Sequence, residues 1–291
     1  MRVLVLGAGG QLGSEVARAA ARVGVEASSR THAQTDVTDP RAIGEAMASS
    51  RATVVINAAA YTAVDRAESE PQAAFAVNET GAAIVAAACT AANAALVHVS
   101  TDFVFDGRLR RPYVESDDPA PLSVYGRSKL AGERAIAVGV KRHLIVRTSW
   151  LFGALSGFVP SVVQRARLGQ PVRMVADQAG CPTPVEELAP ALLRLAGAMS
   201  ESEVGPRGVL HFAGAPATTR FGFARVILDE WARHAGSPAP PLETAASAEV
   251  GMAAARPAWS VLDVSLARTT LGLPIPDWRP RLAALIARLA V

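Results

Sequence analysis

The sequence is poor in cysteine, lysine and tyrosine. Its 291 residues include two cysteines (Cys89 and Cys181), two lysines and three tyrosines. The two cysteines lie far apart in the sequence, so they provide neither the clustered spacing of a metal site nor a disulfide framework. This scarcity excludes a cysteine-rich extracellular fold, and we expect both thiols to be buried or without a chemical role.

An excess of one charge and long hydrophobic runs are also lacking. The net charge is +3, and the basic residues are almost all arginines scattered along the chain. Nucleic-acid-binding proteins usually gather basic residues into a stripe or patch, so we expect no nucleic-acid partner. No apolar run reaches the roughly 20 residues that span a bilayer, and the chain starts with a strand-like segment rather than a signal peptide. We therefore expect a cytoplasmic protein with no membrane partner.

Short apolar runs alternate with longer alanine-rich segments of helical period. Half of the residues are hydrophobic, which is enough for a sizeable core. The alternation predicts a parallel sheet covered by helices on both faces, and right-handed crossovers favour the doubly wound, Rossmann-type α/β topology. The runs and segments, in chain order, are Val3–Leu6, 11–22, Val25–Ser28, 40–49, Val54–Ile56, 72–93, Leu96–Ser100, 123–138 and Leu144–Thr148.

The second half of the chain is less regular. Helical segments are predicted near 157–168, 185–198 and 220–234, with one further strand at Val209–Phe212 and turn-rich stretches between them. No low-complexity linker separates the halves. We expect residues 1–150 to form the Rossmann domain and residues 151–291 to form a smaller C-terminal substrate-binding region. Part of that region, about 185–212, is expected to return to the Rossmann sheet.

A glycine-rich turn, Gly7-Ala-Gly-Gly-Gln-Leu-Gly13, joins the first predicted strand to the first helix. Gly7 permits the tight turn, Gly10 lets the backbone approach a pyrophosphate, and Gly13 lets the helix pack on the strand. The spacing differs from a plain G-x-G-x-x-G, but its position predicts a dinucleotide site. We expect the cofactor to contact Gly7, Gly9, Gly10, Gln11 and Leu12.

The end of the second predicted strand indicates which dinucleotide is used. It reads Ala27-Ser-Ser-Arg30, with no carboxylate before Asp36 to bind the ribose 2′-hydroxyl of NAD. Ser29 and Arg30 can instead hold a 2′-phosphate, although an exposed turn arginine is the alternative. The sequence therefore favours NADPH, with NADH as the alternative donor. Other expected cofactor contacts are Asp36 and Val37 beside the adenine, and Ala58, Ala59 and Ala60 beneath the cofactor.

Tyr125 and Lys129 are four residues apart, on one face of a predicted helix. A nearby ammonium favours the phenolate, so we expect Lys129 to lower the tyrosine pKa from its ordinary value of about 10. Thr101 ends the fourth predicted strand and can donate a hydrogen bond to a substrate carbonyl while Tyr125 protonates its oxygen. Lys129 would also bind the nicotinamide ribose. The alternatives are a solvated surface lysine and a capping turn at the end of the strand.

Several longer motifs accompany these residues and extend the pattern over residues 7–263. Together with the glycine turn and Tyr125-x-x-x-Lys129, they resemble the extended short-chain dehydrogenase/reductases, and among them the family of dTDP-4-dehydrorhamnose reductases. The resemblance implies NADPH-dependent reduction of the C4 ketone of dTDP-4-dehydro-L-rhamnose to dTDP-L-rhamnose, in dTDP-rhamnose biosynthesis. The motifs are Asn57-Ala-Ala-Ala-Tyr-Thr-Ala-Val-Asp65, Ser100-Thr-Asp-Phe-Val-Phe-Asp-Gly107, Arg147-Thr-Ser-Trp150, Asp177-Gln-Ala-Gly-Cys-Pro-Thr183 and Arg256-Pro-Ala-Trp-Ser-Val-Leu-Asp263.

The resemblance also implies roles for individual residues. It makes Thr101, Tyr125 and Lys129 the catalytic group. Trp150 would pack on the sugar ring and Arg256 would serve the nucleotide diphosphate, since arginine pairs bidentately with phosphate. Without the resemblance, a tryptophan after a strand indicates core and Arg256 a surface loop. The full set of residues expected around the dTDP-linked 4-keto-6-deoxysugar is Thr62, Val64, Asp65, Asp102, Phe103, Tyr125, Trp150 and Arg256.

Phe103 departs from the family pattern, which usually has tyrosine at that position. One sugar hydroxyl contact is then missing, and the alternative is a 4-ketoreductase for another dTDP-deoxysugar. A second alternative, from a different class, is a non-catalytic regulatory subunit resembling that of methionine adenosyltransferase. The intact Thr101, Tyr125 and Lys129 argue against it, because a binding subunit has no need of a lysine beside a phenol.

Some members of the family dimerise through a magnesium ion held by acidic side chains. Glu15 and Glu187 match two such positions, but the C-terminal Arg288-Leu-Ala-Val291 supplies no third carboxylate. Mg²⁺ also keeps several waters and few protein ligands. We therefore expect no catalytic metal. The sequence also gives no support to a structural Mg²⁺ ion. A homodimer stays an open expectation.

Overall fold

A six-stranded parallel sheet forms the centre of the protein. The computed structural model describes residues 1–201, 205–269 and 271–290, and the order of the strands is β10-β5-β4-β3-β1-β2. Because the order reverses between β1 and β3, the carboxyl ends of these strands border the crevice where doubly wound sheets bind ligands. The predicted Rossmann-type fold class is confirmed. The strands are β1 (Arg2–Leu6), β2 (Glu26–Arg30), β3 (Val54–Asn57), β4 (Ala95–Thr101), β5 (His143–Thr148) and β10 (Gly208–His211).

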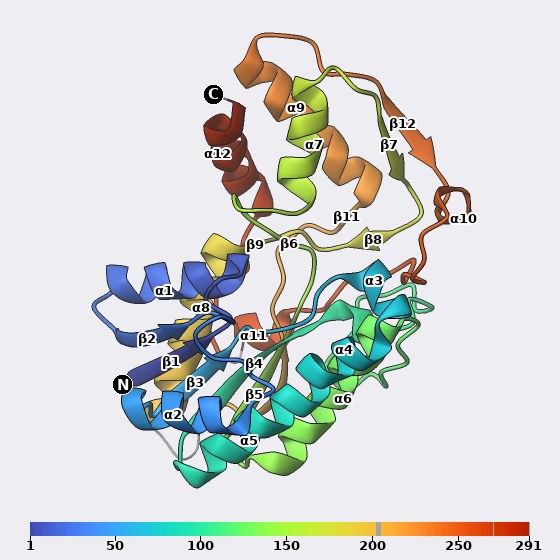
Figure 1. Ribbon diagram of the computed structural model, residues 1–291. Helices are drawn as coiled ribbons and strands as arrows, with labels where there is room; N and C mark the ends of the chain where they lie inside the picture. Colours follow the sequence, from blue (N-terminus) through green and yellow to red (C-terminus); the bar gives the residue numbers. More distant parts are fainter. Residues whose placement is uncertain (202–204, 270, 291) are drawn as a thin grey trace.

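Helices cover both faces of the sheet (Figure 1). Successive residues of a strand point to opposite faces, so in β1 Val3 joins the core on one side and Leu4 the core on the other. This is why the inner strands β1, β3, β4 and β5 are largely apolar. One face carries α1 (Gln11–Arg22) and α8 (Val185–Glu201), and the other carries α2 (Pro40–Ser50), α5 (Gly81–Ala91) and α6 (Val124–Gly139).

A long apolar helical stretch corrects the expectation that no apolar run is long enough to span a bilayer. Residues Pro71–Ala91 have a mean hydropathy of 1.3 over a window within their 21 residues, which by length and composition is enough to cross a membrane. The stretch comprises α4 (Pro71–Phe75), the π-helix η1 (Ala76–Thr80) and α5. Val85 and Cys89 of α5 are buried in the core beneath the sheet, so packing against α2, α6 and the sheet accounts for the apolar sequence.

A second, smaller core lies beyond the carboxyl ends of the strands, in the upper part of Figure 1. It is built around Phe223 and Trp278, on α7 (Phe158–Arg167), α9 (Arg220–Ala235) and α12 (Trp278–Ala290), with the strand pair β7 (Val172–Val175) and β12 (Leu242–Ala245). The sequence predicted α7 and α9 but missed α12 and the β7–β12 pair. The boundary at residue 150 stays a prediction.

Short elements connect the two cores and complete the chain. The strand pairs β6–β9 and β8–β11 lie between the cores, and a 3-10 turn, η2, follows β4 directly. The bounds are β6 (Leu151–Phe152), β8 (Ala179–Gly180), β9 (Thr183–Pro184), β11 (Thr218–Thr219), η2 (Asp102–Val104), α3 (Val64–Ser69), α10 (Ser247–Val250) and α11 (Ser265–Thr269).

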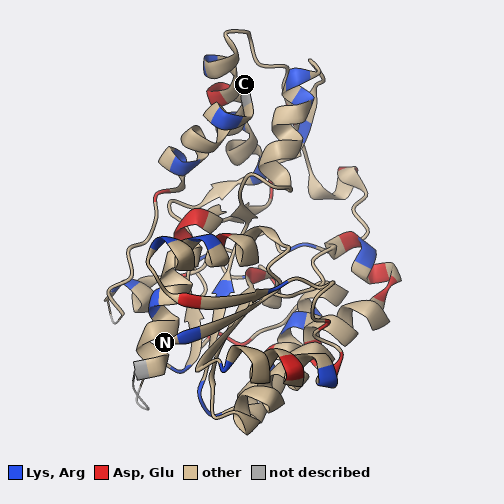
Figure 2. Ribbon diagram, turned by 60° about the vertical axis from the view of Figure 1, so that its left-hand side comes forward, with Lys and Arg blue, Asp and Glu red and all other residues tan. Residues whose placement is uncertain are grey.

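Charged residues are interspersed over both parts of the molecule (Figure 2). The two carboxylates that match the magnesium positions each bind arginine. Glu15 accepts hydrogen bonds from Arg18 at 2.9 Å and from Arg22 at 2.7 Å, and Glu187 pairs with Arg281. Within the described ranges, no three His, Cys, Asp or Glu side chains form a group that could hold a metal ion.

Candidate active site

A cavity of about 500 Å³ lies at the carboxyl ends of β1, β3, β4 and β5. Its walls come from the β1–α1 turn, from η2 and α6, and from Arg220 and Arg256 of the C-terminal half. Residues distant in the sequence therefore meet in one place. Of the residues predicted for the site, the cavity is lined by Gly10, Gln11, Leu12, Ala58, Ala60, Thr62, Val64, Thr101, Asp102, Phe103, Tyr125, Lys129, Trp150 and Arg256.

The glycine turn is tight for the reasons expected from the sequence. Gly7 has φ +79°, and a Cβ there would lie 2.6 Å from the Ala59 nitrogen. A Cβ on Gly13 would lie 2.2 Å from the Gly7 oxygen, so α1 can dock on the turn only without a side chain at that position. Gly10 caps α1 without any side-chain hydrogen bond. The first amides of α1 are thus open to an anion at the cavity, as a pyrophosphate site requires.

Other predicted cofactor residues do not line this cavity. Arg30 reaches Ser49, with Nη2 3.3 Å from its Oγ, and borders a second cavity of about 330 Å³. Asp36 accepts hydrogen bonds from the backbone and hydroxyl of Thr38, and the backbone hydrogen bond is the main cause of its lowered pKa. Val37 is buried. The roles of Ser29, Arg30, Asp36 and Val37 stay predictions, as do those of Gly9 and Ala59.

The start of α6 places Tyr125 and Lys129 at the cavity. Ser123 caps the helix by accepting a hydrogen bond from the Gly126 amide at 3.1 Å. A Cβ on Gly126 would lie 2.3 Å from the Phe103 carbonyl oxygen, so the absence of a side chain lets α6 pack directly against η2. Tyr125 and Lys129 are 9% and 2% exposed. They share a helix face as predicted, but that face is buried.

The expected lowering of the Tyr125 pKa is wrong for this structure. Burial raises the pKa of Tyr125 to about 12; the Thr101 side chain opposes this in part and the Asp102 charge adds to it. Lys129 Nζ donates to the Val99 carbonyl oxygen at 2.7 Å and lies 3.2 Å from His98 Nε2. Burial lowers the pKa of Lys129 to about 8. Desolvation thus outweighs the phenol–ammonium attraction inferred from spacing alone.

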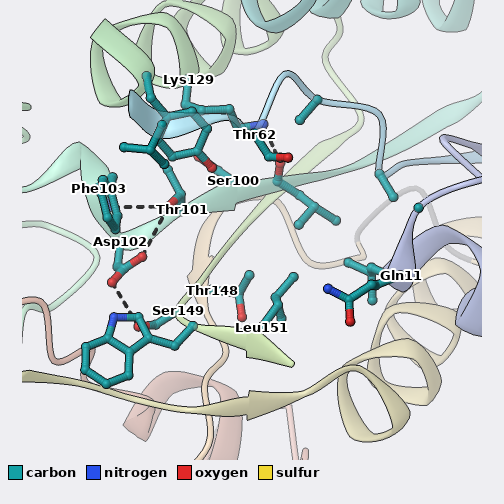
Figure 3. Close-up of a pocket in the computed structure, with 18 of the residues that line it drawn as sticks. Gln11, Thr62, Ser100, Thr101, Asp102, Phe103, Lys129, Thr148, Ser149 and Leu151 are labelled. Carbon is teal, nitrogen blue, oxygen red and sulfur yellow. Dashed lines mark hydrogen bonds between the residues drawn. The ribbon is translucent and has the colours of Figure 1, made fainter. Parts of the chain in front are cut away.

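Thr101, Asp102 and Ser149 form a hydrogen-bonded wall of the cavity (Figure 3). The Thr101 hydroxyl donates to Asp102 Oδ1 at 3.1 Å and accepts from the Phe103 amide at 3.2 Å. Ser149 Oγ donates to Asp102 Oδ2 at 2.9 Å. Asp102 is 2% exposed, and burial raises its pKa despite hydrogen bonds from serines and the charge of Arg220. Ser149 was not identified from the sequence.

Phe103 lies beside the catalytic tyrosine candidate. The Phe103 and Tyr125 rings meet edge to face, with centroids 5.6 Å apart and planes at 72°. Phe103 also lines the cavity, and as a phenylalanine it offers no hydroxyl there. The departure from the family pattern therefore falls at the surface that a substrate would touch.

Arg220 is the main site residue that sequence reasoning missed. Its guanidinium carbon lies 3.6 Å above the centroid of the Trp150 ring, and burial lowers the pKa of Arg220 to about 10. The sequence around it, Thr218-Thr-Arg220, indicates only the start of a helix. Thr219 indeed caps α9, so this signal concerns the helix and says nothing about the cavity.

Trp150 is held in one orientation by its neighbours. Its backbone has φ 43°, and the ring packs so closely on Gly180 that a Cβ there would lie 2.4 Å from Trp150 Cε2. The indole is half-buried and lines the cavity, so it is not simply a core residue. The glycine of the Asp177–Thr183 motif thus has a steric role.

Asp65 and Arg256 are paired with each other. Arg256 donates to both carboxylate oxygens of Asp65, at 3.0 and 2.6 Å, and this hydrogen bond is the main cause of the lowered pKa of Asp65. Asp65 does not line the cavity, whereas Arg256 does. The pair ties the start of α3 to the loop after α10, and the role of Asp65 toward a sugar stays a prediction.

A buried ion pair supports the cavity from behind. Arg147 donates to Glu133 from Nη2 at 2.7 Å and from Nε at 3.0 Å, and both side chains are 4% exposed. Ser100 donates to the same carboxylate. The three residues join β4, β5 and α6. Thr101 ends β4, Ser149 directly follows β5, and Tyr125 lies in α6. No spacing in the sequence indicated this network.

Comparisons with known proteins agree on one family. Residues 1–291 match the family model described as RmlD substrate binding domain. A dTDP-4-dehydrorhamnose reductase of Mycobacterium tuberculosis (strain ATCC 25618 / H37Rv) is 42% identical over 295 residues, covering 98% of this chain and 92% of the relative. The spore coat polysaccharide biosynthesis protein SpsK of Bacillus subtilis (strain 168) is 36% identical, covering 90% of this chain and 88% of the relative.

A solved structure extends this likeness to three dimensions. The crystal structure of dTDP-4-dehydrorhamnose reductase from Bacillus anthracis str. Ames in complex with NADP matches with a TM-score of 0.90 and 31% identity, covering 99% of both chains. The match thus includes the sheet, the second core and the connections between them. The chain belongs to the RmlD substrate binding domain family, and the proteins similar to it include several named dTDP-4-dehydrorhamnose reductase.

Proposed function

We propose that this protein reduces the C4 ketone of dTDP-4-dehydro-L-rhamnose to dTDP-L-rhamnose with NADPH. The observation that carries the proposal is the convergence of Thr101, Tyr125 and Lys129 on one cavity that also includes the glycine turn. The names of its relatives support the same reaction. A binding protein would not need a protonated phenol, a second hydroxyl donor and a buried lysine around one point.

Tyr125 is the proton donor in this proposal. Burial keeps its phenol protonated at neutral pH, so the hydroxyl is available to protonate the carbonyl oxygen. Thr101 donates a second hydrogen bond to that oxygen, and such donors aimed at developing negative charge stabilise the transition state. The Thr101 hydroxyl has one proton, which Asp102 Oδ1 accepts in this structure. To donate to the carbonyl oxygen, the hydroxyl must turn from Asp102 toward the substrate.

The residues at the β1–α1 turn fit NADPH. The amides at the start of α1 would hold the pyrophosphate, the small side chains of Ala58 and Ala60 would leave room for the cofactor, and Lys129 would bind the ribose hydroxyls. When bound there, NADPH supplies the hydride that reduces the carbonyl carbon. Ser29 and Arg30 receive the 2′-phosphate, with no carboxylate at the end of β2 to favour NADH.

The C-terminal half provides the basic side chains that would bind the diphosphate of the substrate. Arg220 and Arg256 both line the cavity, and a guanidinium matches phosphate oxygens in a bidentate way. Arg220 is partly buried, which strengthens its attraction for a diphosphate, because charges interact more strongly away from water. Thr62, Val64, Asp102, Phe103 and Trp150 would then surround the sugar.

Turnover by the purified chain tests this function. The chain is mixed with dTDP-4-dehydro-L-rhamnose and NADPH, and NADPH oxidation is followed for the native protein and for Tyr125→Phe. We expect turnover by the native chain and a loss of about 100-fold or more in Tyr125→Phe, since a positioned general acid contributes that much. Absence of turnover in the native chain would contradict the function, and equal rates would contradict the assigned acid.

A second candidate is the reduction of another dTDP-linked 4-keto-6-deoxysugar. Phe103 favours it, because this cavity residue lacks the hydroxyl that the family usually has there. Offering dTDP-4-keto sugars that differ at single hydroxyl positions to the native chain and to Phe103→Tyr separates the two candidates. A higher kcat/KM for another sugar in the native chain, reversed by Phe103→Tyr, would replace the first assignment.

A further inference from the structure

A row of buried polar side chains extends from Lys129 into the sheet, away from the cavity. Lys129 Nζ lies 3.2 Å from His98 Nε2, and His98 Nδ1 lies 3.2 Å from Asn57 Nδ2. His98 and Asn57 are 1% and 2% exposed, and neither lines the cavity. The row crosses α6, β4 and β3.

The backbone determines the direction of these hydrogen bonds. The Ala59 amide donates to Asn57 Oδ1 at 3.1 Å, so the oxygen of the Asn57 amide must face the backbone and its NH₂ group must face His98. An NH₂ group can only donate, hence His98 Nδ1 accepts. Burial and the Lys129 charge lower the pKa of His98 well below its ordinary value. The neutral imidazole therefore carries its single proton on Nε2, which points at Lys129.

We propose that His98 is a positioning residue that opposes the charging of Lys129, through a tautomer imposed by Asn57 and the Ala59 amide. As an amine, Lys129 accepts from His98 Nε2–H and donates to the Val99 carbonyl oxygen. As an ammonium, it would place an N–H against the imidazole N–H. Moving the imidazole proton to Nδ1 would remove that clash but create another with the Asn57 NH₂ group.

Other titratable groups near Lys129 do not replace the effect of His98 on the charging of the lysine. Glu133, one turn further along α6, favours the ammonium, but its carboxylate is shared with Arg147 of β5 and Ser100 of β4. Tyr125 of α6 is neutral over the range concerned, and the Asp102 carboxylate of η2 acts on Tyr125 and Arg220. Desolvation of Nζ lowers the lysine pKa in the same direction as His98.

Labelling the lysines tests the inference in the full chain without nucleotide. The chain has two lysines, and Lys141 is exposed and serves as an internal reference. We expect the ¹³Cε signal of Lys129 to titrate well below that of Lys141, and ¹⁵N spectra to show His98 with its proton on Nε2. The His98→Phe variant identifies the His98 signals by their loss. A proton on Nδ1, or Lys129 titrating together with Lys141, overturns the proposal.

Asn57→Asp then tests the coupling. A carboxylate accepts from both the Ala59 amide and an imidazole Nδ1–H, so the proton should move to Nδ1 and free Nε2 to accept from the ammonium. We expect the Lys129 midpoint to rise by about one pH unit, a tenfold change in its protonation equilibrium. Because the substitution also adds charge, it is repeated in His98→Phe, where we expect a smaller rise. Equal rises in the two backgrounds overturn the proposal.

The inference rests on the proposed function only for the catalytic importance of Lys129. The NMR measurements need no turnover and no substrate. Failure of the proposed reductase activity therefore leaves the lysine titration and the histidine tautomer unaffected. Conversely, normal turnover combined with the other tautomer would reject the role of His98 and leave the reductase assignment standing.

Discussion

The contact between Gly180 and Trp150 gives a sharp test of how the cavity is shaped. In Gly180→Ala the new methyl group would lie 2.4, 2.6 and 2.8 Å from Cε2, Nε1 and Cζ2 of the indole, where ordinary contacts begin at 3.4 Å. The ring must therefore retreat by about 1 Å. It cannot retreat freely, because Arg220 lies 3.6 Å above it and the Trp150 backbone already has φ 43°.

Two consequences of different size follow. Overpacking of this kind destabilises a protein by about 1–3 kcal/mol, which lowers the Tm by about 2–4 °C for each kcal/mol. The effect on turnover should be larger, because a displacement of about 1 Å in a substrate-positioning group can reduce the rate about 100-fold. We expect kcat/KM for the dTDP-sugar to fall by about that factor, while NADPH binding at the α1 turn is unchanged.

Thermal unfolding measures the change in stability, and steady-state kinetics with a fluorescence titration of NADPH measure the changes in turnover and in cofactor binding. Gly44→Ala is the matched control: Gly44 lies in α2 with nothing within 4 Å of an added Cβ, so alanine should stabilise the helix by up to about 1 kcal/mol without changing the kinetics. A kcat/KM within twofold of native in Gly180→Ala would refute the steric role of Gly180. An equal loss of NADPH affinity would show that the disturbance is not confined to the sugar side.

Three further predictions concern buried charges. Arg147→Met should lower the free energy of unfolding by about 3–5 kcal/mol, because it leaves the Glu133 carboxylate buried without its cation; urea unfolding measures this, and the double variant with Glu133→Leu should recover part of the loss. If the double variant is no more stable than the single one, the uncompensated charge is not the cause. Arg220→Met should raise KM for the dTDP-sugar about tenfold or more and leave NADPH affinity unchanged, as expected for the loss of a charge-assisted contact; an unchanged KM would remove Arg220 from the diphosphate site. Folding lowers the Lys129 pKa from 10.5 to about 8, so the folded chain binds this proton more weakly and stability rises with pH between those values. The free energy of unfolding should increase by about 2–3 kcal/mol across that window in the native chain relative to Lys129→Met, and parallel pH profiles of the two proteins would contradict the lowered pKa.

Local patterns were sufficient to predict the layers of the fold and the position of the turn. Strands β1, β3, β4 and β5 and helices α1, α2 and α6 begin and end close to the predicted residues, because hydrophobic period and glycine position are local properties. The C-terminal helix α12 and the β7–β12 pair were missed. The apolar residues of α12, Trp278, Leu282, Leu285 and Ile286, follow helical spacing, so this pattern was present in the sequence and was overlooked. The strands β7 and β12 have only four residues each, and they become recognisable only against the second core.

Residue identity along the chain determined that a glycine turn, a tyrosine–lysine face and a strand-end threonine exist in this protein. Only the tertiary structure decided how they behave. It brought Arg220 over Trp150 from a distant segment, placed His98 and Asn57 behind Lys129, and buried the Tyr125 phenol so that its pKa rises rather than falls. The physical reason is that charge state and orientation depend on desolvation and on partners far away in the sequence, and neither can be read from local spacing.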